Sequence, residues 1–379
     1  MNQKHFYFII LFICLIVSPG YTVELNQLTI ENPLKLNLSG TLQAIVTKSQ
    51  IEALDEDVDI HRFRLNVGGK LNPNVSFFSE FEFGGNLSPE NTWPSGTGGN
   101  PRMKILDENA VGTSTAAGAR YAQKDMGTDS RLVQAYMKFN YFKKLKILVG
   151  QMARGSNYEL NIPVNKLETI NYSTNVGQFG KYTRGIKFVL IPFSFMKIGI
   201  GIDDSVGGIS GGTDLPKSKF SPGGKIVLIP WKKHLSFKLC ARQIYLTQNM
   251  PDANAFVAGT NFKYKGFHFM GEVYHLHVNP VANSDKKKET KGDICSWFVH
   301  ASYKIPKVNL QIVSRYNYFE KRMKDRRTDI LKAKANYYME IITAGINYNF
   351  SPHSRLQLMY DVVDGPKNDS FDAQFEVSF

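Results

Sequence analysis

Basic side chains recur at every second position in several short segments of the chain. HRFRLNVGGKL carries Arg62, Arg64 and Lys70, and KLKILVG carries Lys144 and Lys146. Successive side chains of a β-strand point to opposite faces, so this spacing places the cations of each segment on one face. Rows of guanidinium and ammonium groups attract anions, and rings of such charges bias ion permeation. The chemistry indicated is electrostatic selection of anions.

Groups that could do other chemistry are isolated. His275 and His277 would share one strand face and could bind a metal, but no third ligand lies nearby in sequence, and a pair at a rim is the simpler interpretation. Asp203 and Asp204 would face opposite ways, which indicates the solvated start of a loop. The glycine-rich run at 207–212 opens no helix, so it does not resemble a nucleotide-binding loop. The sequence therefore predicts a protein that is not an enzyme and has no cofactor or metal.

Short alternating runs account for nearly the whole chain, and helical periodicity is scarce. We expect strands near residues 34–46, 61–71, 74–84, 130–141, 144–152, 182–192, 195–203, 221–230, 235–246, 254–265, 267–278, 294–304, 307–319, 336–350, 354–361 and 370–379. Their number, sixteen, is even, and most are close to the 9–11 residues that a tilted strand needs to cross a bilayer. The fold class predicted is all-β, a 16-stranded antiparallel transmembrane β-barrel.

The connections between these strands alternate in length along the whole chain. Very short links such as 72–73, 265–266 and 351–353 alternate with long connections such as 85–129 and 320–335. A soluble sandwich has no reason to collect its long loops at one end, whereas outer-membrane barrels have short periplasmic turns and long extracellular loops. The sequence therefore predicts the outer membrane of a Gram-negative bacterium as the location.

Aromatic residues gather at the two ends of the predicted strands, as in the aromatic girdles of membrane barrels. Those next to short turns or at the C-terminus are Tyr141, Phe142, Phe193, Trp231, Tyr264, Phe267, Tyr303, Phe350 and Phe379. Those next to long loops are Tyr182, Tyr245, Tyr274, Tyr316, Tyr318, Tyr360 and Phe371. Packing in a soluble core does not concentrate aromatic residues at element ends, so this pattern favours the barrel over a soluble β-protein.

The N-terminus has the pattern of a secretory signal peptide. Lys4 gives a positive start, an apolar run covers residues 6–17, and small residues follow at 18–20. The run is shorter than the roughly 17–25 residues of a spanning helix, and no other apolar run of about 18 residues follows it. We expect residues 1–22 to be a cleaved signal peptide and residues 23–379 to be the barrel domain.

The cysteines and the charge balance set further limits. A lipoprotein anchor at Cys14 is disfavoured, because the bulky Ile13 stands where a small residue is expected before the lipidated cysteine. A plain signal peptide is therefore preferred. Cys240 and Cys295 have no metal-ligand spacing, although they could pair in an oxidising compartment.

The chain has 46 Lys and Arg residues against 33 Asp and Glu residues, a formal net charge of +13. In an exported protein this excess favours anionic solutes or surfaces over nucleic acid.

The chain ends on FDAQFEVSF, residues 371–379, in which apolar and polar residues alternate. One face would contact lipid and the other the lumen, and pairing with the first strand would leave no open edge. The alternating apolar residues and the terminal Phe379 resemble the signal by which barrel-assembly machinery recognises its clients. We therefore expect a closing strand here, with Phe379 as the assembly signal.

Strand parity sorts the charged residues into lipid-facing and lumen-facing sets. The lumen-facing basic residues expected are Arg62, Arg64, Lys70, Lys138, Lys144, Lys146, Lys187, Lys225, Lys238, Arg242, Lys263, Lys304, Arg315 and Arg355. The lumen-facing acids are fewer, namely Glu80, Glu82, Glu272, Asp372 and Glu376. Glu80 and Glu82 could neutralise Arg62 and Arg64, because their strands are antiparallel neighbours. A charged interior across all strands would be water-filled and anion-preferring. The alternative is that the basic residues only balance lumenal acids or bind lipopolysaccharide at the rim.

The connection at 154–182 is a candidate constriction of this pore. It is long and partly apolar, and it carries the cations Arg154, Lys166 and Lys181. It lies at the point in the chain where sixteen-stranded porins fold a loop into the barrel. A surface loop folded over the mouth is the alternative.

Two segments, HRFRLNVGGKLNPNVSFFSEFEFGG and LVQAYMKFNYFKKLKILVGQM, resemble the phosphate-selective porin O and P family. They share an R-x-R strand, a tight turn, an acidic-aromatic strand and a later K-x-x-V-G-Q strand. The resemblance implies a homotrimeric, sixteen-stranded porin whose lumenal cations draw anions through a constriction, with Arg62 and Arg64 on the matching strand. The chain departs from the family after Gln151, where residues 152–155 replace a basic residue and a Pro-Phe-Gly-like turn.

Together these patterns predict a passive outer-membrane channel for small hydrophilic solutes with a preference for anions, phosphate among them. The partners expected are outer-membrane lipid and lipopolysaccharide, the barrel-assembly machinery, small anionic solutes and further copies of the chain in a homotrimer, with no nucleic acid. A general, non-selective porin is the alternative within transport. Outside transport, the alternatives are an adhesin or structural barrel acting through loops 85–129 and 320–335, and a hydrolase, for which no catalytic set is visible.

Overall fold

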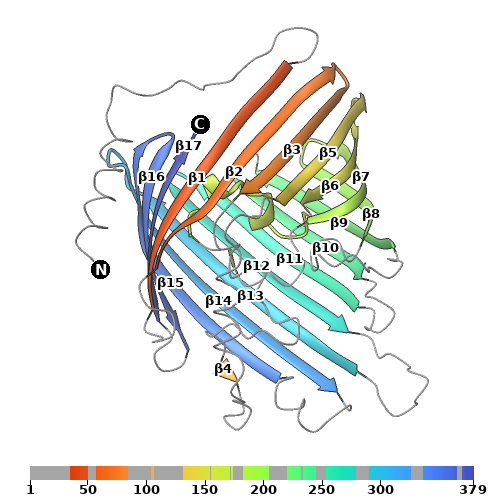
Figure 1. Ribbon diagram of the computed structural model, residues 1–379. Coiled ribbons are helices and arrows are strands. Elements are labelled where there is room, and N and C mark those ends of the chain that lie inside the picture. Colours follow the sequence, from red (N-terminus) through yellow and green to blue (C-terminus); the bar gives the residue numbers. More distant parts are fainter. Residues whose placement is uncertain are drawn as a thin grey trace.

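The computed structural model shows a closed ring of antiparallel strands (Figure 1). It describes residues 35–49, 57–83, 104–105, 131–153, 155–170, 172–173, 182–204, 220–231, 234–244, 253–278, 290–325, 336–364 and 369–379. The expected signal peptide and the residues Arg154, Lys181 and Tyr245 lie outside these ranges. In the described part of the chain, no helix is long and apolar enough to cross a membrane.

Sixteen long strands make up the ring. They are β1 (Lys35–Ser49), β2 (Asp57–Asn72), β3 (Val75–Phe83), β5 (Arg131–Phe142), β6 (Leu145–Ala153), β7 (Tyr182–Phe193), β8 (Met196–Asp204), β9 (Phe220–Trp231), β10 (Leu235–Ile244), β11 (Ala253–Tyr264), β12 (Phe267–Val278), β13 (Thr290–Lys304), β14 (Leu310–Asp325), β15 (Asn336–Ser351), β16 (Ser354–Val363) and β17 (Ser370–Ser378). Each pairs with the next, β3 pairs with β5, and β17 pairs with β1. The predicted 16-stranded antiparallel barrel is confirmed. A two-residue strand, β4 (Lys104–Ile105), pairs with β15 from within the expected long connection 85–129.

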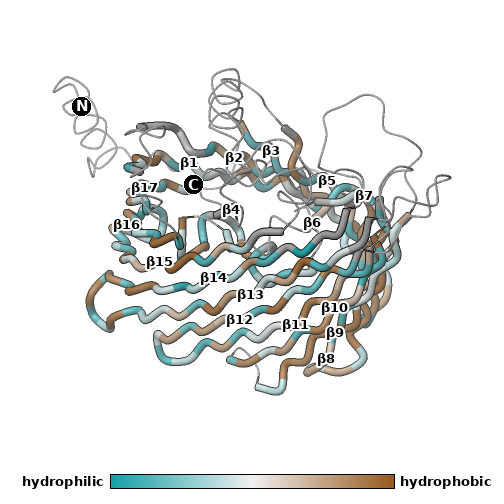
Figure 2. Tube along the Cα trace, turned by 90° about the horizontal axis from the view of Figure 1, so that it is seen from below, coloured by the Kyte–Doolittle hydropathy of each residue, from teal (hydrophilic) through white to brown (hydrophobic). Residues whose placement is uncertain are grey.

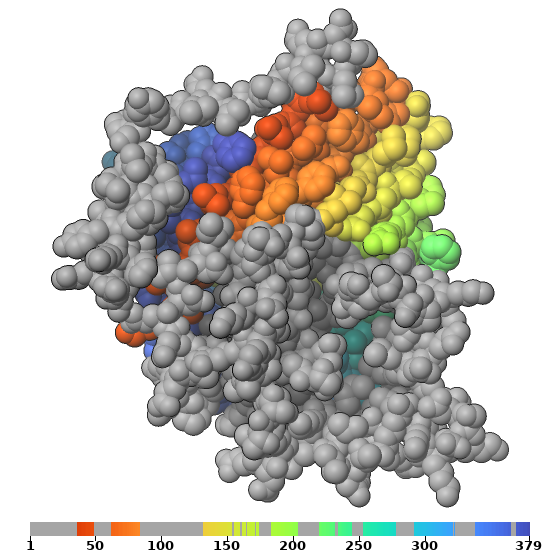
Figure 3. Space-filling view, in the orientation of Figure 1, coloured from red at the N-terminus to blue at the C-terminus, as the bar shows by residue number. Residues whose placement is uncertain are grey.

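The barrel closes where the last strand meets the first. The backbone of Phe379 accepts a hydrogen bond from Gly40 N at 2.9 Å and donates one to Gly40 O at 3.0 Å. The phenyl ring lies over the same glycine, where an added Cβ would come within 2.8 Å of ring atom Cε1. Glycine at position 40 therefore makes room for the terminal ring. Figure 3 shows the C-terminal strands, in blue, directly beside the N-terminal strand, in red.

Side chains alternate between an outward and an inward face along each strand. On β12, Phe267, Phe269 and Val273 are exposed, whereas Met270 and Tyr274 are buried. The exposed set includes the apolar residues Leu132, Ile186, Phe188, Ile200, Ile202, Ile226, Leu239, Phe256, Ile312, Ile342, Val362 and Phe371. Figure 2 shows this alternation of hydrophobic and hydrophilic positions along the strands. A lipid-facing surface of a membrane barrel has this composition.

Aromatic side chains at the end with short turns are exposed as expected, at 60% for Tyr141, 61% for Phe142 and 57% for Phe267. At the end with long loops, one expectation is wrong. Tyr274 was expected in the outer aromatic ring, but it faces inward and is completely buried. The physical reason is the regular register of β12, which gives Tyr274 the same parity as the inward Glu272.

The inward face is not charged along its whole height. Near the long-loop ends of β10 to β16, a cluster of inward apolar residues is buried: Ile244, Ala253, Ala255, Val257, Tyr274, Leu276, Ile294, Phe319, Met339 and Val363. The expectation of a polar, water-filled interior across all strands is therefore wrong for this region. At the ends of β12 and β13 polar residues, among them His275, His277 and Asp293, face outward instead. The usual apolar-out, polar-in alternation is reversed there, so it assigns the wrong face to the lumen.

Candidate functional site

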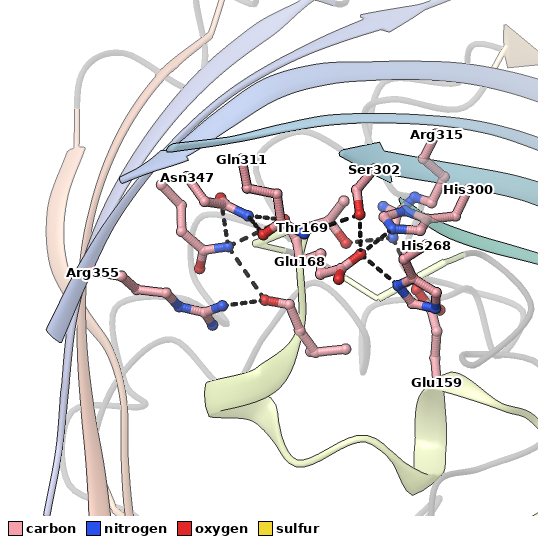
Figure 4. Close-up of polar contacts among 12 residues, drawn as sticks. Glu159, Glu168, Thr169, His268, His300, Ser302, Gln311, Arg315, Asn347 and Arg355 are labelled. Carbon is pink, nitrogen blue, oxygen red and sulfur yellow. Dashed lines mark hydrogen bonds and ion pairs between the residues drawn. The ribbon is translucent and has the colours of Figure 1, made fainter. Parts of the chain in front are cut away.

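The connection between β6 and β7 enters the barrel. We call its described residues, 155–170 and 172–173, the inner loop; it contains two short 3-10 segments, η4 (Glu159–Asn161) and η5 (Val164–Lys166). Its hydrogen bonds run to inward side chains of β10 and of β12 to β16. Figure 4 shows those that reach β12 to β16 from Glu159, Leu167, Glu168 and Thr169. Several of these partners lie in the middle of their strands, so the inner loop lies within the lumen and not over its mouth.

Tyr158 fixes the start of the inner loop. Its backbone N–H donates to Glu272 Oε2 at 2.8 Å, and its hydroxyl lies 3.2 Å from Ser236 Oγ. The ammonium of Lys238 sits 4.0 Å from the centre of its ring and 3.6 Å from the Glu272 carboxylate. Gly259 lies beneath the ring, where a Cβ would approach it to 3.0 Å. Burial raises the pKa of the Tyr158 hydroxyl, which therefore stays protonated at neutral pH.

Arg315 on β14 joins the two halves of the inner loop. Its guanidinium donates to Glu159 Oε1 at 3.2 Å and to Thr169 Oγ1 at 2.8 Å. The other carboxylate oxygen of Glu159 accepts from the backbone N–H of Ser173 at 2.7 Å. The side chains of Arg315 and Glu159 are only 4% and 2% exposed. This buried ion pair connects the beginning and the end of the loop to the same point on the wall.

Glu168 lies at the middle of a polar cluster on the same wall. Its Oε2 accepts hydrogen bonds from His268 Nδ1 at 2.7 Å, His300 Nε2 at 2.6 Å and Ser302 Oγ at 2.8 Å (Figure 4). Burial alone would raise the pKa of this carboxyl, but the hydrogen bonds from the two imidazoles outweigh burial and hold the pKa well below its usual range. The carboxylate therefore stays ionised and acts as an acceptor for three side chains.

The main chain around Glu168 is also held. Arg355 donates to Leu167 O at 2.5 Å and to Glu376 Oε2 at 2.9 Å. Asn347 donates to the backbone carbonyl of Glu168 at 2.9 Å. Side chains of β15 and β16 therefore fix the backbone of the inner loop on both sides of the carboxylate.

A cavity of about 560 Å³ lies between the inner loop and the wall formed by β2, β3 and β5 to β10. Asn161, Ile162, Pro163 and Lys166 line it from the loop. The basic residues of its lining are Arg64, Lys166, Lys187, Lys225 and Arg242, and the acidic ones are Glu80 and Asp203. Cations therefore outnumber acids around this space.

Ion pairs engage the arginines and both acids of this lining. Arg64 donates to Glu80 Oε1 at 2.7 Å and to Glu82 Oε2 at 2.6 Å. Arg242 on β10 forms an ion pair with Asp203 on β8, across the intervening strand β9. Asp203 was expected at a solvated loop start, but it is buried, because it is the penultimate residue of β8 and has inward parity.

The lysines of the wall contact main-chain carbonyl groups. Lys187 Nζ donates to Ala153 O at 2.5 Å, and Lys225 Nζ donates to Gly155 O at 3.3 Å. The aliphatic part of Lys225 lies across Gly199, where a Cβ would approach its Cγ to 3.0 Å. Arg64, by contrast, contacts the carboxylates of Glu80 and Glu82.

The other predicted basic residues are spread along the barrel. Arg62 and Lys238 are buried, Lys138 and Lys146 are partly buried, and Lys70, Lys263 and Lys304 are exposed near the short turns. Lys144 was expected on an inward strand face but lies in the turn between β5 and β6, where it donates to Pro192 O at 3.2 Å. Cys240 and Cys295 are both free thiols.

The sequence did not single out Glu168, His268 or His300. The two histidines lie on adjacent strands with inward parity, which is the signal that could have indicated them. His275 and His277, which were singled out, face outward near the long-loop end and share Asp293 Oδ1 at 3.2 and 2.9 Å.

No protein-family model matches the sequence, and no curated protein matches it. Solved structures match by fold. The outer membrane channel DcaP of Acinetobacter baumannii is 14% identical, with a TM-score of 0.62 over 93% of this chain and 99% of that chain. OmpT, an outer membrane protein of Vibrio cholerae in a trimer form, is 10% identical, with a TM-score of 0.59 over 92% and 100%. An anion-selective porin from Comamonas acidovorans is 12% identical, with a TM-score of 0.58 over 91% and 100%. The chain thus has the fold of Gram-negative outer-membrane porins, in agreement with the predicted location.

Proposed function

We propose that the protein is an outer-membrane porin, a passive channel for small hydrophilic solutes that prefers anions. The observation that carries this proposal is the cavity between the inner loop and the opposite wall, whose lining holds more basic than acidic residues. The inner loop is fastened to β12–β16, so a solute would pass on the other side, between the loop and β2–β10.

The lysines supply the selectivity in this proposal. Arg64 and Arg242 face carboxylates, whereas Lys187 and Lys225 face main-chain carbonyls. Lys166 is exposed on the loop side of the same space. Charges on two sides of a narrow, water-filled passage act on each permeating ion, so Lys225 on the wall and Lys166 on the loop favour anions over cations. Phosphate preference is a finer proposal that rests on the resemblance of the Arg62 and Arg64 strand.

Other expectations accompany this proposal. The trimer form of one structural neighbour and the exposed apolar outward face support a homotrimer in the membrane. The contact of Phe379 with Gly40 supports a role for this residue in barrel assembly, and lipopolysaccharide would contact the outer rim. We propose a transport protein and not an enzyme.

The test is the reversal potential of the refolded barrel in a planar bilayer under a KCl gradient. Open channels that reverse toward the chloride potential are expected, and phosphate competition would then test the finer preference. Reversal toward the potassium potential would contradict anion selection and favour a general or cation-preferring porin. Absence of conductance would contradict the channel and favour an adhesin with a closed lumen.

A further inference from the structure

The cluster around Glu168 has the composition of a transition-metal site. Glu168 Oε2, His268 Nδ1 and His300 Nε2 lie within 4.8 Å of one another, and Ser302 Oγ is 2.8 Å from the same carboxylate oxygen. Two imidazole nitrogens, one carboxylate oxygen and a fourth oxygen are a ligand set that Zn²⁺ accepts in tetrahedral geometry. The ligands come from the inner loop, β12 and β13, which are brought together only by the fold.

The spacing of the three groups is close to that of a coordination sphere. Bonds of about 2.0–2.2 Å place tetrahedral ligands about 3.3–3.5 Å apart. The carboxylate oxygen lies 2.7 and 2.6 Å from the two imidazole nitrogens, so it would retreat by about 0.7 Å to admit an ion between them. Glu168 can do this because it lies on a loop and its side chain is 19% exposed, whereas the histidines are fixed on paired strands.

One nitrogen of each imidazole faces the same point, the Oε2 atom of Glu168. Their ring centres are 5.4 Å apart, and the ring planes are inclined by 63°, so the rings do not stack. Among the described residues, the distal nitrogens His268 Nε2 and His300 Nδ1 have no hydrogen-bond partner. The proximal nitrogens donate to Glu168 in this structure, so metal binding would displace their protons, as it does at histidine ligands in general.

The site is supported by its surroundings and opens to the lumen. The backbone carbonyls of Leu167 and Glu168 accept hydrogen bonds from Arg355 and Asn347, which hold the carboxylate beside β12 and β13. The histidine side chains are 6% and 3% exposed, and the partly exposed carboxylate provides the route of entry.

We propose that Glu168, His268 and His300, with Ser302 or a water as the fourth ligand, bind a borderline divalent metal ion such as Zn²⁺ and thereby fasten the inner loop to the barrel wall. The ion would link the loop to two strands, in addition to the hydrogen bonds from Arg355 and Asn347 that already hold the loop backbone there. This proposal concerns metal binding itself and stands apart from the direction of ion selectivity.

The test is titration of the refolded, chelator-treated barrel with Co²⁺, followed by its visible absorption, and then displacement by Zn²⁺ in a calorimeter. One ion per chain is expected. Substitution of a residue that only hydrogen-bonds to a metal ligand reduces metal affinity by about 10–100-fold. Glu168→Gln and His300→Gln each remove a ligand itself, so we expect them to weaken binding by at least about 100-fold. Because Glu168 lies on a loop and not on a strand, Glu168→Gln tests the site even where a histidine variant fails to fold.

The matched control is the outward cluster, which has the same composition. His275→Gln and His277→Gln remove two imidazoles that share Asp293 at 3.2 and 2.9 Å. These variants are expected to bind Co²⁺ as the wild type does. The proposal is overturned where the wild type binds no Co²⁺, or where the outward variants lose the signal and Glu168→Gln retains it.

Discussion

Arg315 on β14 and Glu159 on the inner loop form an ion pair of 3.2 Å whose two side chains are almost completely buried. The pair crosses from the barrel wall to the segment that occupies the lumen. Because Glu159 also accepts from Ser173 N, one carboxylate ties the wall to both halves of the loop.

Replacing Arg315 with Met should therefore release the inner loop. Removal of one partner leaves the other charge buried and unpaired, a loss of about 3–5 kcal/mol for such pairs. Urea unfolding in detergent micelles should show this loss, and single channels should become noisier because the loop moves. Arg322→Met, on the same strand, removes an exposed pair with Glu320 and should leave both readouts unchanged. Equal effects of the two variants would refute the anchoring role of Arg315.

Lys225→Gln should weaken anion preference. A unit charge about 8 Å from a permeating ion in water contributes about 0.5 kcal/mol, favourable for chloride and unfavourable for potassium. The ratio of chloride to potassium permeability should therefore fall by roughly a factor of six before screening. The effect should be largest at low salt, where screening is weak. Reversal potentials under a KCl gradient provide the measurement. Lys144→Gln, in a turn and away from the cavity lining, is the control; a shift as large there would argue against selection at the cavity.

Gly40→Ala should impair closure of the barrel. The new Cβ would lie within 2.8 Å of the Phe379 ring and 3.0 Å of Arg64 O, so the terminal ring must move. Overpacking of this kind costs about 1–3 kcal/mol. The fraction of barrel that resists unfolding in unboiled SDS gels should drop. Gly224→Ala, whose Cβ would have no neighbour nearer than 3.7 Å, should fold with wild-type yield; a similar loss there would implicate glycine content rather than the Phe379 contact.

Gly259→Val should displace Tyr158. The added side chain would press on the ring, which a Cβ alone approaches to 3.0 Å, and on Gly271 O at 3.1 Å. We expect destabilisation of about 1–3 kcal/mol and larger current fluctuations. A double-mutant cycle with Tyr158→Ala measures the coupling between the two positions, and the valine should cost less once the ring is gone. Purely additive effects would contradict the contact.

Much of the fold could be predicted because a membrane barrel leaves its period in the sequence. A strand that faces lipid on one side and the lumen on the other alternates apolar and polar residues. The short turns between such strands then indicate how many strands there are and which way each one runs. Tyr274 shows where this fails: it was assigned by its place near a long loop, but parity along β12 places it inward. At this end of β12 the apolar Leu276 also faces inward while His275 and His277 face outward, so the usual alternation is reversed and only the closed sheet shows which face is buried.

The inner loop could be located from its length, but its contacts could not be predicted. Glu168 meets His268 and His300 across 100 and 132 positions of the chain. The neighbouring strands β12 and β13 are joined by a long connection, so their register does not follow from turn geometry. Only the paired strands show that His268 lies opposite Ser302 and two residue pairs from His300.

The most direct test of the account is single-channel conductance before and after removal of the inner loop. Residues 156–173 would be replaced by a short Gly-Ser link, with folding checked by the gel shift on boiling. The account predicts open, anion-preferring channels in the wild type, and a higher conductance with weaker anion preference in the variant. Unchanged conductance and selectivity would contradict the position of the inner loop in the permeation path, and a silent wild type would contradict the channel itself.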